Sequence, residues 1–219
     1  MKTSLKALSL SALSLSNGSN GRLPTLLAAL AALVLVGCQT ASTSSSMASA
    51  PAAPAKPAMS APAAKPAMAA IRIKAGPPVA GFSADADGNV WLTDRGFIGA
   101  SSIGRDGLAI ANTKSPGIYQ SENYSMTAFS EPLPNGKYTV RLHFSETYEG
   151  ITGAGQRVFS YNVEGKDFKD FDIWVKAGGF ARAYIETVEV EIKDGKLDIT
   201  FTPQIENPQI NGIEIIPKA

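Results

Sequence analysis

The sequence of 219 residues is poor in the side chains that metal and redox sites need, because it has one cysteine and one histidine. A single cysteine cannot close an intrachain disulfide, and it cannot supply the thiolates of a structural zinc or iron–sulfur site. A single histidine cannot pair with a second imidazole around a metal ion. The sequence therefore predicts no cofactor, no metal site and no disulfide scaffold.

An excess of positive charge is also missing. The chain has 20 Lys and Arg residues against 19 Asp and Glu residues. No basic field can therefore neutralise several phosphates, which excludes nucleic acid as a partner. Five of the basic residues precede Ile71, which leaves 15 basic and 19 acidic residues from there on and a net charge of −4. A mildly acidic surface suits neutral ligands better than anionic ones.

The first 70 residues lack aromatic and acidic side chains altogether. All nine Phe, six Tyr and two Trp lie between Phe82 and Phe201, and the first acidic residue is Asp85. Alanine raises the hydrophobic content of this first part without supplying the large side chains that bury area. The sequence therefore predicts one folded domain, over residues 71–219.

An apolar run at residues 23–37 follows three basic residues and is too short to span a bilayer comfortably. It is typical of a secretory signal peptide, which we expect over residues 1–37. Its end, the string LVGC at 35–38, resembles the lipobox of bacterial lipoproteins. That resemblance implies cleavage before Cys38, a diacylglycerol on its thiol and a lipid anchor in a membrane. Gln39 in the next position implies the outer membrane in that family.

The alternative is an ordinary cleaved signal, or a short membrane anchor, with an incidental cysteine. Residues 38–70, which hold Cys38, are otherwise rich in Ala, Pro and Ser and contain no aromatic residue and no Leu, Ile or Val. Such a segment cannot offset its ordering entropy by burial, so we expect a disordered spacer.

From Ile71 onward the hydrophobic pattern has a period of two and never a sustained helical period. Tyr138, Val140, Leu142 and Phe144 alternate with polar residues and place four bulky groups on one face of a strand. Similar alternation recurs at 159–163, 188–192 and 197–201, and the Asp194-Gly195 pair between the last two predicts a hairpin. About eight short strands separated by turns indicate an all-β domain, an antiparallel β-sandwich or jelly roll.

Seven blocks of this region resemble successive blocks of the malectin domain, in the family's order and over residues 71–216. They are KAGPP (74–78), NVWLTDRGF (89–97), IYQSENY (118–124), NGKYTVRLHFSETY (135–148), QRVFSYNVEG (156–165), DFDI (170–173) and ENPQINGIEI (206–215). The resemblance implies a jelly-roll β-sandwich that binds glucose-containing oligosaccharides. In bacteria such domains are often attached to secreted or surface proteins.

The resemblance also implies a binding site. The family's binding positions fall on Tyr124, Tyr148 and Glu206, with a further aromatic near Phe97, and Glu149 stands where malectin has a second aromatic. Sugar recognition needs aromatic faces for the C–H side of a pyranose and a few oriented polar groups for its hydroxyls. We expect these loops to converge at one end of the sandwich.

Two further positions depart from the family, since Lys74 and Pro77 replace a favoured Asn and Gly. They change local backbone freedom and hydrogen-bond donors, and we expect a shifted specificity. Without the resemblance, the tyrosines of the site are equally typical of half-buried packing residues. Tyr119 is predicted to be a core residue. Trp91 and Trp174 are predicted to be structural residues, because each follows a branched apolar residue inside a strand-like block.

The sequence gives little support for an enzyme. Glu146 and Glu149 lie three apart in a predicted loop, a spacing that fixes neither the distance nor the pKa values that a glycosidase pair needs. We expect Glu146 to order the loop by accepting a backbone N–H, and His143 to be a hydrogen-bonded structural residue. Asp85 to Asn89 fit a turn better than a calcium loop, because Val90 occupies the position that requires glycine. No catalytic residue is predicted.

The sequence thus favours a non-enzymatic, membrane-anchored lipoprotein that binds an oligosaccharide or envelope glycan. The alternative is a structural or protein-interaction module of the cell envelope, with an envelope protein as partner. The aromatic side chain that is missing at Glu149 favours this alternative.

Overall fold

The computed structural model describes residues 68–218, which form three antiparallel sheets containing twelve strands. The predicted signal peptide, Cys38 and nearly all of the predicted spacer lie outside the described residues. The strands and both hydrophobic clusters described below lie within 68–218, so this part has its own core. None of the described helices is long and apolar enough to span a bilayer.

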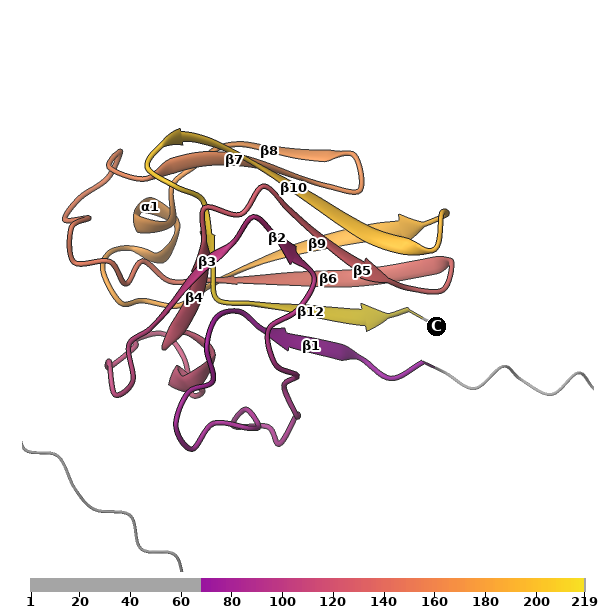
Figure 1. The fold of residues 1–219 in the computed structure, drawn as a ribbon, viewed down its shortest axis with the longest axis horizontal. Helices are drawn as coiled ribbons and strands as arrows, with labels where there is room; N and C mark the ends of the chain where they lie inside the picture. Colours follow the sequence, from indigo (N-terminus) through magenta and orange to yellow (C-terminus); the bar gives the residue numbers. More distant parts are fainter. Residues whose placement is uncertain (1–67, 219) are drawn as a thin grey trace, which may run out of the picture. The chain divides into compact units, whose positions relative to one another are not determined.

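Two larger sheets face each other and form the β-sandwich that the period-two pattern predicts (Figure 1). The first has the order β1 (Ile71–Lys74), β12 (Gly212–Pro217), β6 (Gly136–Phe144), β9 (Tyr184–Ile192). The second has the order β2 (Phe97–Ile98), β5 (Ala128–Pro132), β10 (Lys196–Ile205), β7 (Val158–Val163), β8 (Lys166–Phe171).

A smaller third sheet lies at one end of the sandwich and has the order β11 (Gln209–Ile210), β4 (Ser121–Tyr124), β3 (Ser101–Gly104). A 3-10 turn, η1 (Pro116–Ile118), precedes β4. One short α-helix, α1 (Ile173–Ala177), follows β8. At the opposite end of the sandwich, the start of β1 lies beside the C-terminus (Figure 1).

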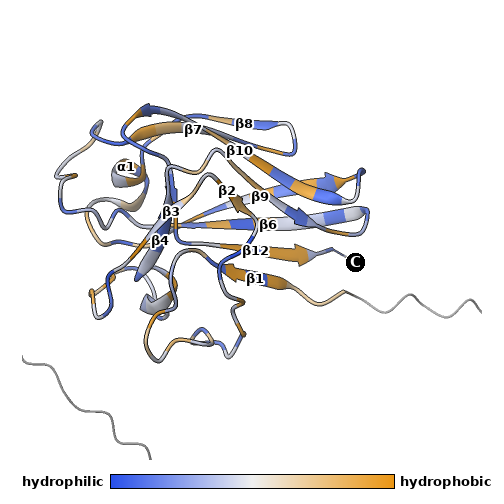
Figure 2. Cartoon of the chain, in the orientation of Figure 1, coloured by the Kyte–Doolittle hydropathy of each residue, from blue (hydrophilic) through white to orange (hydrophobic). Residues whose placement is uncertain are grey.

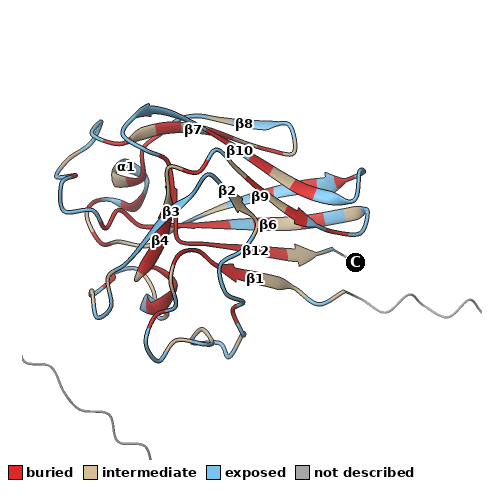
Figure 3. Cartoon of the chain, in the orientation of Figure 1, coloured by how far each residue is buried: buried red, intermediate tan, exposed pale blue. Residues whose placement is uncertain are grey.

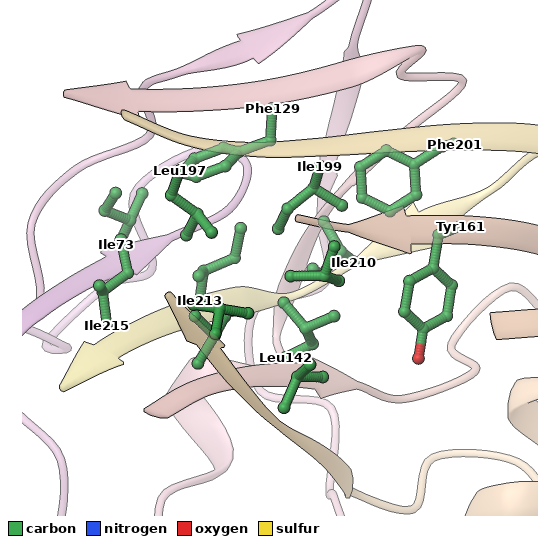
Figure 4. Packing of buried hydrophobic residues seen from close by; sticks show 14 of the residues in the cluster. Ile73, Phe129, Leu142, Tyr161, Leu197, Ile199, Phe201, Ile210, Ile213 and Ile215 are labelled. Atoms are coloured by element: carbon green, nitrogen blue, oxygen red, sulfur yellow. The ribbon is translucent and has the colours of Figure 1, made fainter. Parts of the chain in front are cut away.

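The main core fills the space between the two larger sheets. The four residues predicted to face inward from β6 are at most 3% exposed. Figure 4 shows Leu142 and Ile213 of one sheet facing Ile199 and Phe201 of the other. Along β6 and β9, hydrophobic and polar residues alternate, and buried and exposed residues alternate with them (Figures 2 and 3). The predicted face of β6 is therefore confirmed.

A second hydrophobic cluster, of Trp91, Ile110, Ile118, Tyr119 and Ala181, covers the other face of β6 near its end. It buries His143, whose ring lies 5.2 Å from that of Trp91. The two ring nitrogens of His143 lie 2.9 Å from Tyr119 Oη and 2.9 Å from Glu214 Oε1. Burial of Trp91 and Tyr119, and the hydrogen bonds of His143, agree with the structural roles expected for them.

The predicted hairpin at Asp194-Gly195 is wrong. This turn carries the chain from β9, in the first large sheet, to β10, in the second. β9 pairs with β6 over nine positions, while β10 pairs with β5 on one side and β7 on the other. Turn chemistry specifies the chain reversal but not the pairing partner, which long-range contacts decide. A two-residue hairpin does form at Glu164-Gly165, where Val163 pairs with Lys166 across β7 and β8.

Trp174 belongs to helix α1 and not to a strand, contrary to the expectation from its block. The side chain of Asp172 caps the helix by accepting the Val175 N–H at 3.2 Å, and Gly178 ends it with a φ of 80°. These caps act locally and override the extended pattern of the preceding residues.

Candidate functional site

A cleft of about 260 Å³ opens near the small sheet, at the end of the sandwich opposite the start of β1. It is formed by β3 and β4, the loop after β6, the start of β7 and the turn after β10, which Figure 1 shows at the same end of the molecule. The residues that line it are Ile103, Arg105, Glu122, Tyr124, Tyr148, Arg157, Glu206 and Asn207.

The structure brings together three of the predicted site residues, Tyr124, Tyr148 and Glu206, from segments far apart in the sequence. Tyr124 ends β4, the central strand of the small sheet, and is half-buried. Tyr148 is 48% exposed and lies against Gly150, where a Cβ atom would come within 2.6 Å of its ring. Glu206 is exposed in a turn, with a φ of 58°. Two aromatic rings and one carboxylate therefore face a common space.

The other two predicted residues lie elsewhere. Glu149 lines an adjoining, more open hollow of about 480 Å³ together with Arg105, Asp106 and Tyr148. Phe97 does not line the cleft: it sits on β2, half-buried, and its ring packs 4.9 Å from that of Phe129 in the core. The pairing of β2 with β5, which sets Phe97 opposite Phe129, accounts for this position.

A buried ion pair holds the loops of the cleft in place. Glu146 is fully buried and accepts the Tyr148 N–H at 3.0 Å and the Arg157 Nε–H at 2.7 Å. Arg157 also donates from Nη1 to the carbonyl of Asn207. Burial raises the pKa of Glu146, and the Arg157 guanidinium opposes this shift. The expectation that Glu146 orders the loop through a backbone N–H is confirmed.

A second ion pair joins the residue after β3 to β4, and both of its members line the cleft. Arg105 Nη1 lies 3.1 Å from Glu122 Oε1, and the other oxygen of Glu122 accepts the Thr147 hydroxyl at 2.5 Å. Sequence reasoning did not single out Arg105, Glu122, Arg157 or Asn207. The sequence offers only a weak signal for them: Glu122 and Arg157 are charged residues inside two of the family-like blocks, and Arg157 directly precedes the apolar strand β7.

Lys74 lies behind the small sheet, outside the cleft. Its ammonium is buried and donates to the Ser121 hydroxyl, to the Ser121 carbonyl at 3.3 Å and to the Ala75 carbonyl at 3.2 Å. Burial lowers the pKa of Lys74 to about 7, although Asp94, Glu122 and Asp106 oppose the shift. Lys74 and Pro77 line a separate hollow of about 220 Å³. Lys74 thus supports β4 from the side opposite the cleft.

The Asp85 segment forms the expected turn. One oxygen of Asp85 accepts the N–H groups of Asp87 and Asn89 at 3.0 and 2.9 Å, and the other accepts the Trp91 indole N–H at 3.1 Å. These hydrogen bonds hold the pKa of Asp85 below its usual value. Within residues 68–218, no three His, Cys, Asp or Glu side chains are grouped so that they could hold a metal ion.

Comparison with known proteins gives a family match over most of the described chain. Residues 69–213 match the malectin domain. Receptor-like protein 4 of Arabidopsis thaliana is 29% identical over 167 residues, which cover 67% of this chain and 27% of that protein. The chain therefore corresponds to about a quarter of this curated relative.

Two solved structures share the fold. A Bacteroides uniformis beta-glucuronidase is 19% identical with a TM-score of 0.59, over 68% of this chain and 18% of that one. The plant receptor-like kinase FER, solved in complex with the peptide RALF23 and LLG2, gives 23% identity and a TM-score of 0.52, over 69% and 40%. At these identities the likeness concerns the fold alone.

Proposed function

The chain belongs to the malectin-domain family, and from this premise we propose that its cleft binds an oligosaccharide or envelope glycan and releases it unchanged. The observation that carries the proposal is the convergence of Tyr124, Tyr148 and Glu206, which come from three separate segments, on one cleft. Convergence of aromatic faces with an exposed carboxylate is what recognition of a pyranose requires.

The geometry gives each residue a role in binding. The exposed ring of Tyr148 offers a face for the C–H side of a sugar, and the half-buried Tyr124 offers a second aromatic surface. Glu206 accepts hydrogen bonds from sugar hydroxyls. The ion pairs of Arg105 with Glu122 and of Arg157 with Glu146 keep these groups in place before a ligand arrives, which lowers the entropy cost of binding.

The arrangement of carboxyl groups supports binding without hydrolysis. Glycoside hydrolysis needs two carboxyl groups that flank the scissile bond, one of them able to donate a proton. Glu146 is buried and accepts hydrogen bonds from Tyr148 and Arg157, and Glu122 accepts from Thr147 and pairs with Arg105. Neither is free to act on a sugar, which leaves Glu206 as the one unpaired carboxylate among the residues that line the cleft.

The N-terminal sequence supports a location for this binding. The lipobox-like string ending at Cys38 and the following Ala/Pro/Ser-rich segment fit a lipid anchor and a spacer. We infer that the domain is held at the cell envelope, on the outer membrane, where its cleft meets envelope glycans.

Calorimetric titration of fragment 68–219 with gluco-oligosaccharides tests the proposal. Tyr124→Ala and Tyr148→Ala each remove an aromatic face, and we expect losses of roughly 0.5–1.5 kcal/mol beyond area burial. Glu206→Ala should cost about 1.5–3 kcal/mol, because its hydrogen bonds are charge-assisted. Glu191→Ala, an exposed carboxylate on β9, is the control and should change nothing. Equal affinity in all four variants would place the site elsewhere.

A protein-interaction module is the second candidate. Glu149 replaces an aromatic side chain beside the cleft, and a similar fold in FER was solved together with a peptide and LLG2. A glycan array and an affinity purification from envelope extracts, both made with fragment 68–219, separate the candidates. Binding to no glycan, together with recovery of one envelope protein that Tyr148→Ala abolishes, would favour this module.

A further inference from the structure

The cleft and the hollow beside it form one continuous recognition surface. Arg105 and Tyr148 line both, so the exposed Tyr148 ring stands at the boundary between them. A ligand that stacks on Tyr148 therefore meets the side chains of both hollows at once.

The cations of this surface are neutralised within the protein. Arg105 pairs with Glu122 at 3.1 Å, and Arg157 pairs with Glu146 at 2.7 Å. In both pairs the carboxylate side chain is at most 3% exposed and the guanidinium at most 19%. Each guanidinium at the floor of the surface thus has a buried carboxylate beside it, although Arg105 Nη1 makes no hydrogen bond within the described residues.

The carboxylates at the rim, in contrast, have no basic partner among the described residues. Glu206 lines the cleft, while Asp106 and Glu149 line the adjoining hollow, and all three are exposed. None of them forms an ion pair within residues 68–218. Lys74 lies close enough to interact with Asp106 and Glu122 electrostatically, but it is buried behind β4 and lines neither hollow.

An exposed tyrosine ring surrounded by uncompensated carboxylates is the setting that attracts an ammonium group. The ring face attracts a cation through its quadrupole, and each carboxylate adds a Coulomb attraction and a hydrogen-bond acceptor. A uronic acid at the same place meets repulsion from the three carboxylates and finds both arginines already paired.

We propose that this surface selects amino sugars with a free amine, such as de-N-acetylated hexosamine oligomers, over their N-acetylated, neutral and uronic acid counterparts. This inference rests on the proposed function and adds the chemical class of the ligand. The preference comes from the rim residues Asp106, Glu149 and Glu206 acting around Tyr148.

A matched set of β-1,4 tetrasaccharides tests the proposal, because the set varies mainly the substituent at C2. Fragment 68–219 is titrated with the tetramers of glucose, N-acetylglucosamine and glucosamine, and with a tetrameric uronate. At low salt we expect the glucosamine tetramer to bind roughly tenfold tighter than the glucose tetramer. The preference should shrink when NaCl is raised from roughly 0.02 M to roughly 0.5 M, because exposed charges are screened.

The double variant Asp106→Asn/Glu149→Gln removes two rim charges while keeping side-chain size. We expect it to bring the ratio of glucosamine to glucose tetramer affinity close to one. The control, Glu189→Gln/Glu191→Gln on β9, changes the net charge equally but away from the cleft, and should leave the ratio as in the parent.

The outcomes separate the inference from the proposed function. Equal binding of the glucose and glucosamine tetramers overturns the inference and leaves glycan binding standing. If neither these tetramers nor the sugars of a broader glycan array bind, both fail. A short lysine-rich peptide that matches the glucosamine tetramer in affinity, without being displaced by it, would show non-specific charge attraction and would also overturn the inference.

Discussion

Arg157 lines the cleft and also links two of the segments that form it. Through Glu146 it is linked to the Tyr148 backbone, and through its Nη1 it holds the carbonyl of Asn207, next to Glu206. Its side chain is 5% exposed and its partner Glu146 is fully buried. Removing one member of such a pair leaves an uncompensated charge inside the protein, which costs far more than the pair itself contributes.

Arg157→Met should therefore destabilise the domain by about 3–5 kcal/mol, measured by urea denaturation. The double variant Glu146→Met/Arg157→Met leaves no buried charge behind, so it should recover a large part of this loss. Its sugar affinity should stay reduced, because neither Tyr148 nor Asn207 is held. A double variant as unstable as Arg157→Met would mean that the cost does not arise from the unpaired carboxylate.

Lys74 should make stability depend on pH above neutrality. The pKa of Lys74 falls from 10.5 to about 7 on folding, mainly through burial. Between these two values the unfolded chain binds a proton that the folded protein does not hold, so unfolding takes up a proton. The free energy of unfolding should then rise with pH across this window, by on the order of 1 kcal/mol per pH unit.

Urea denaturation at several pH values between 7 and 10 measures this effect. Lys74→Met should flatten the rise, because the variant has no ammonium to neutralise on folding. Lys193→Met, at a side chain that is 77% exposed, should keep the slope of the parent. An unchanged slope in Lys74→Met would show that the buried amine does not titrate as the structure implies.

For single residues, the sequence predicted three side chains that line the cleft, but not the residues that hold the loops of the cleft in place. Tyr124, Tyr148 and Glu206 follow from the resemblance to the malectin domain, and they do share one cleft. Arg157 and Asn207 are 50 residues apart, and only the folded chain shows that they meet. Phe97 was misplaced because its surroundings depend on which strand β2 pairs with.

β6 is the element whose sequence pattern determines most of the core. Its inward residues are buried between the two large sheets, and its backbone pairs with β9 on one side and β12 on the other. Alternation predicts this correctly because one face must be apolar wherever a strand covers a core. Pairing partners have no comparable signal, which is why the turn at Asp194-Gly195 suggested a hairpin that does not form.

Leu142→Ala should destabilise the domain by about 2–5 kcal/mol, because Leu142 is fully buried and its loss leaves a cavity. Arg141→Ala, on the opposite face of the same strand, should cost much less, since its side chain is 46% exposed and lies 3.9 Å from Glu214. Chemical denaturation of both variants provides the comparison. Equal shifts in the denaturation midpoint would contradict the assignment of faces.

In the described domain, the first strand begins at one end and the cleft lies at the other. The chain enters β1 beside the C-terminus, while the cleft lies at the other end, where the loops after β6 and β10 meet (Figure 1). Residue 68, before which the sequence predicts a spacer, thus lies at the end opposite the cleft. This geometry suits a domain that is held from behind and presents its cleft outward.

The tether itself is predicted from the sequence, because Cys38 lies outside the described residues. Cys38 is the only cysteine of the chain, and it is the last residue of the lipobox-like string. Acylation at one thiol plus the new amino terminus gives two or three acyl chains, enough for stable anchoring where a single chain is marginal.

Cys38→Ser should therefore move the protein from the membrane pellet to the soluble envelope fraction. The same variant should retain the sugar affinity of fragment 68–219, because the cleft lies in the separately described domain. Retention of Cys38→Ser in the pellet after carbonate washing would rule out the lipid anchor and favour an apolar segment as the anchor instead.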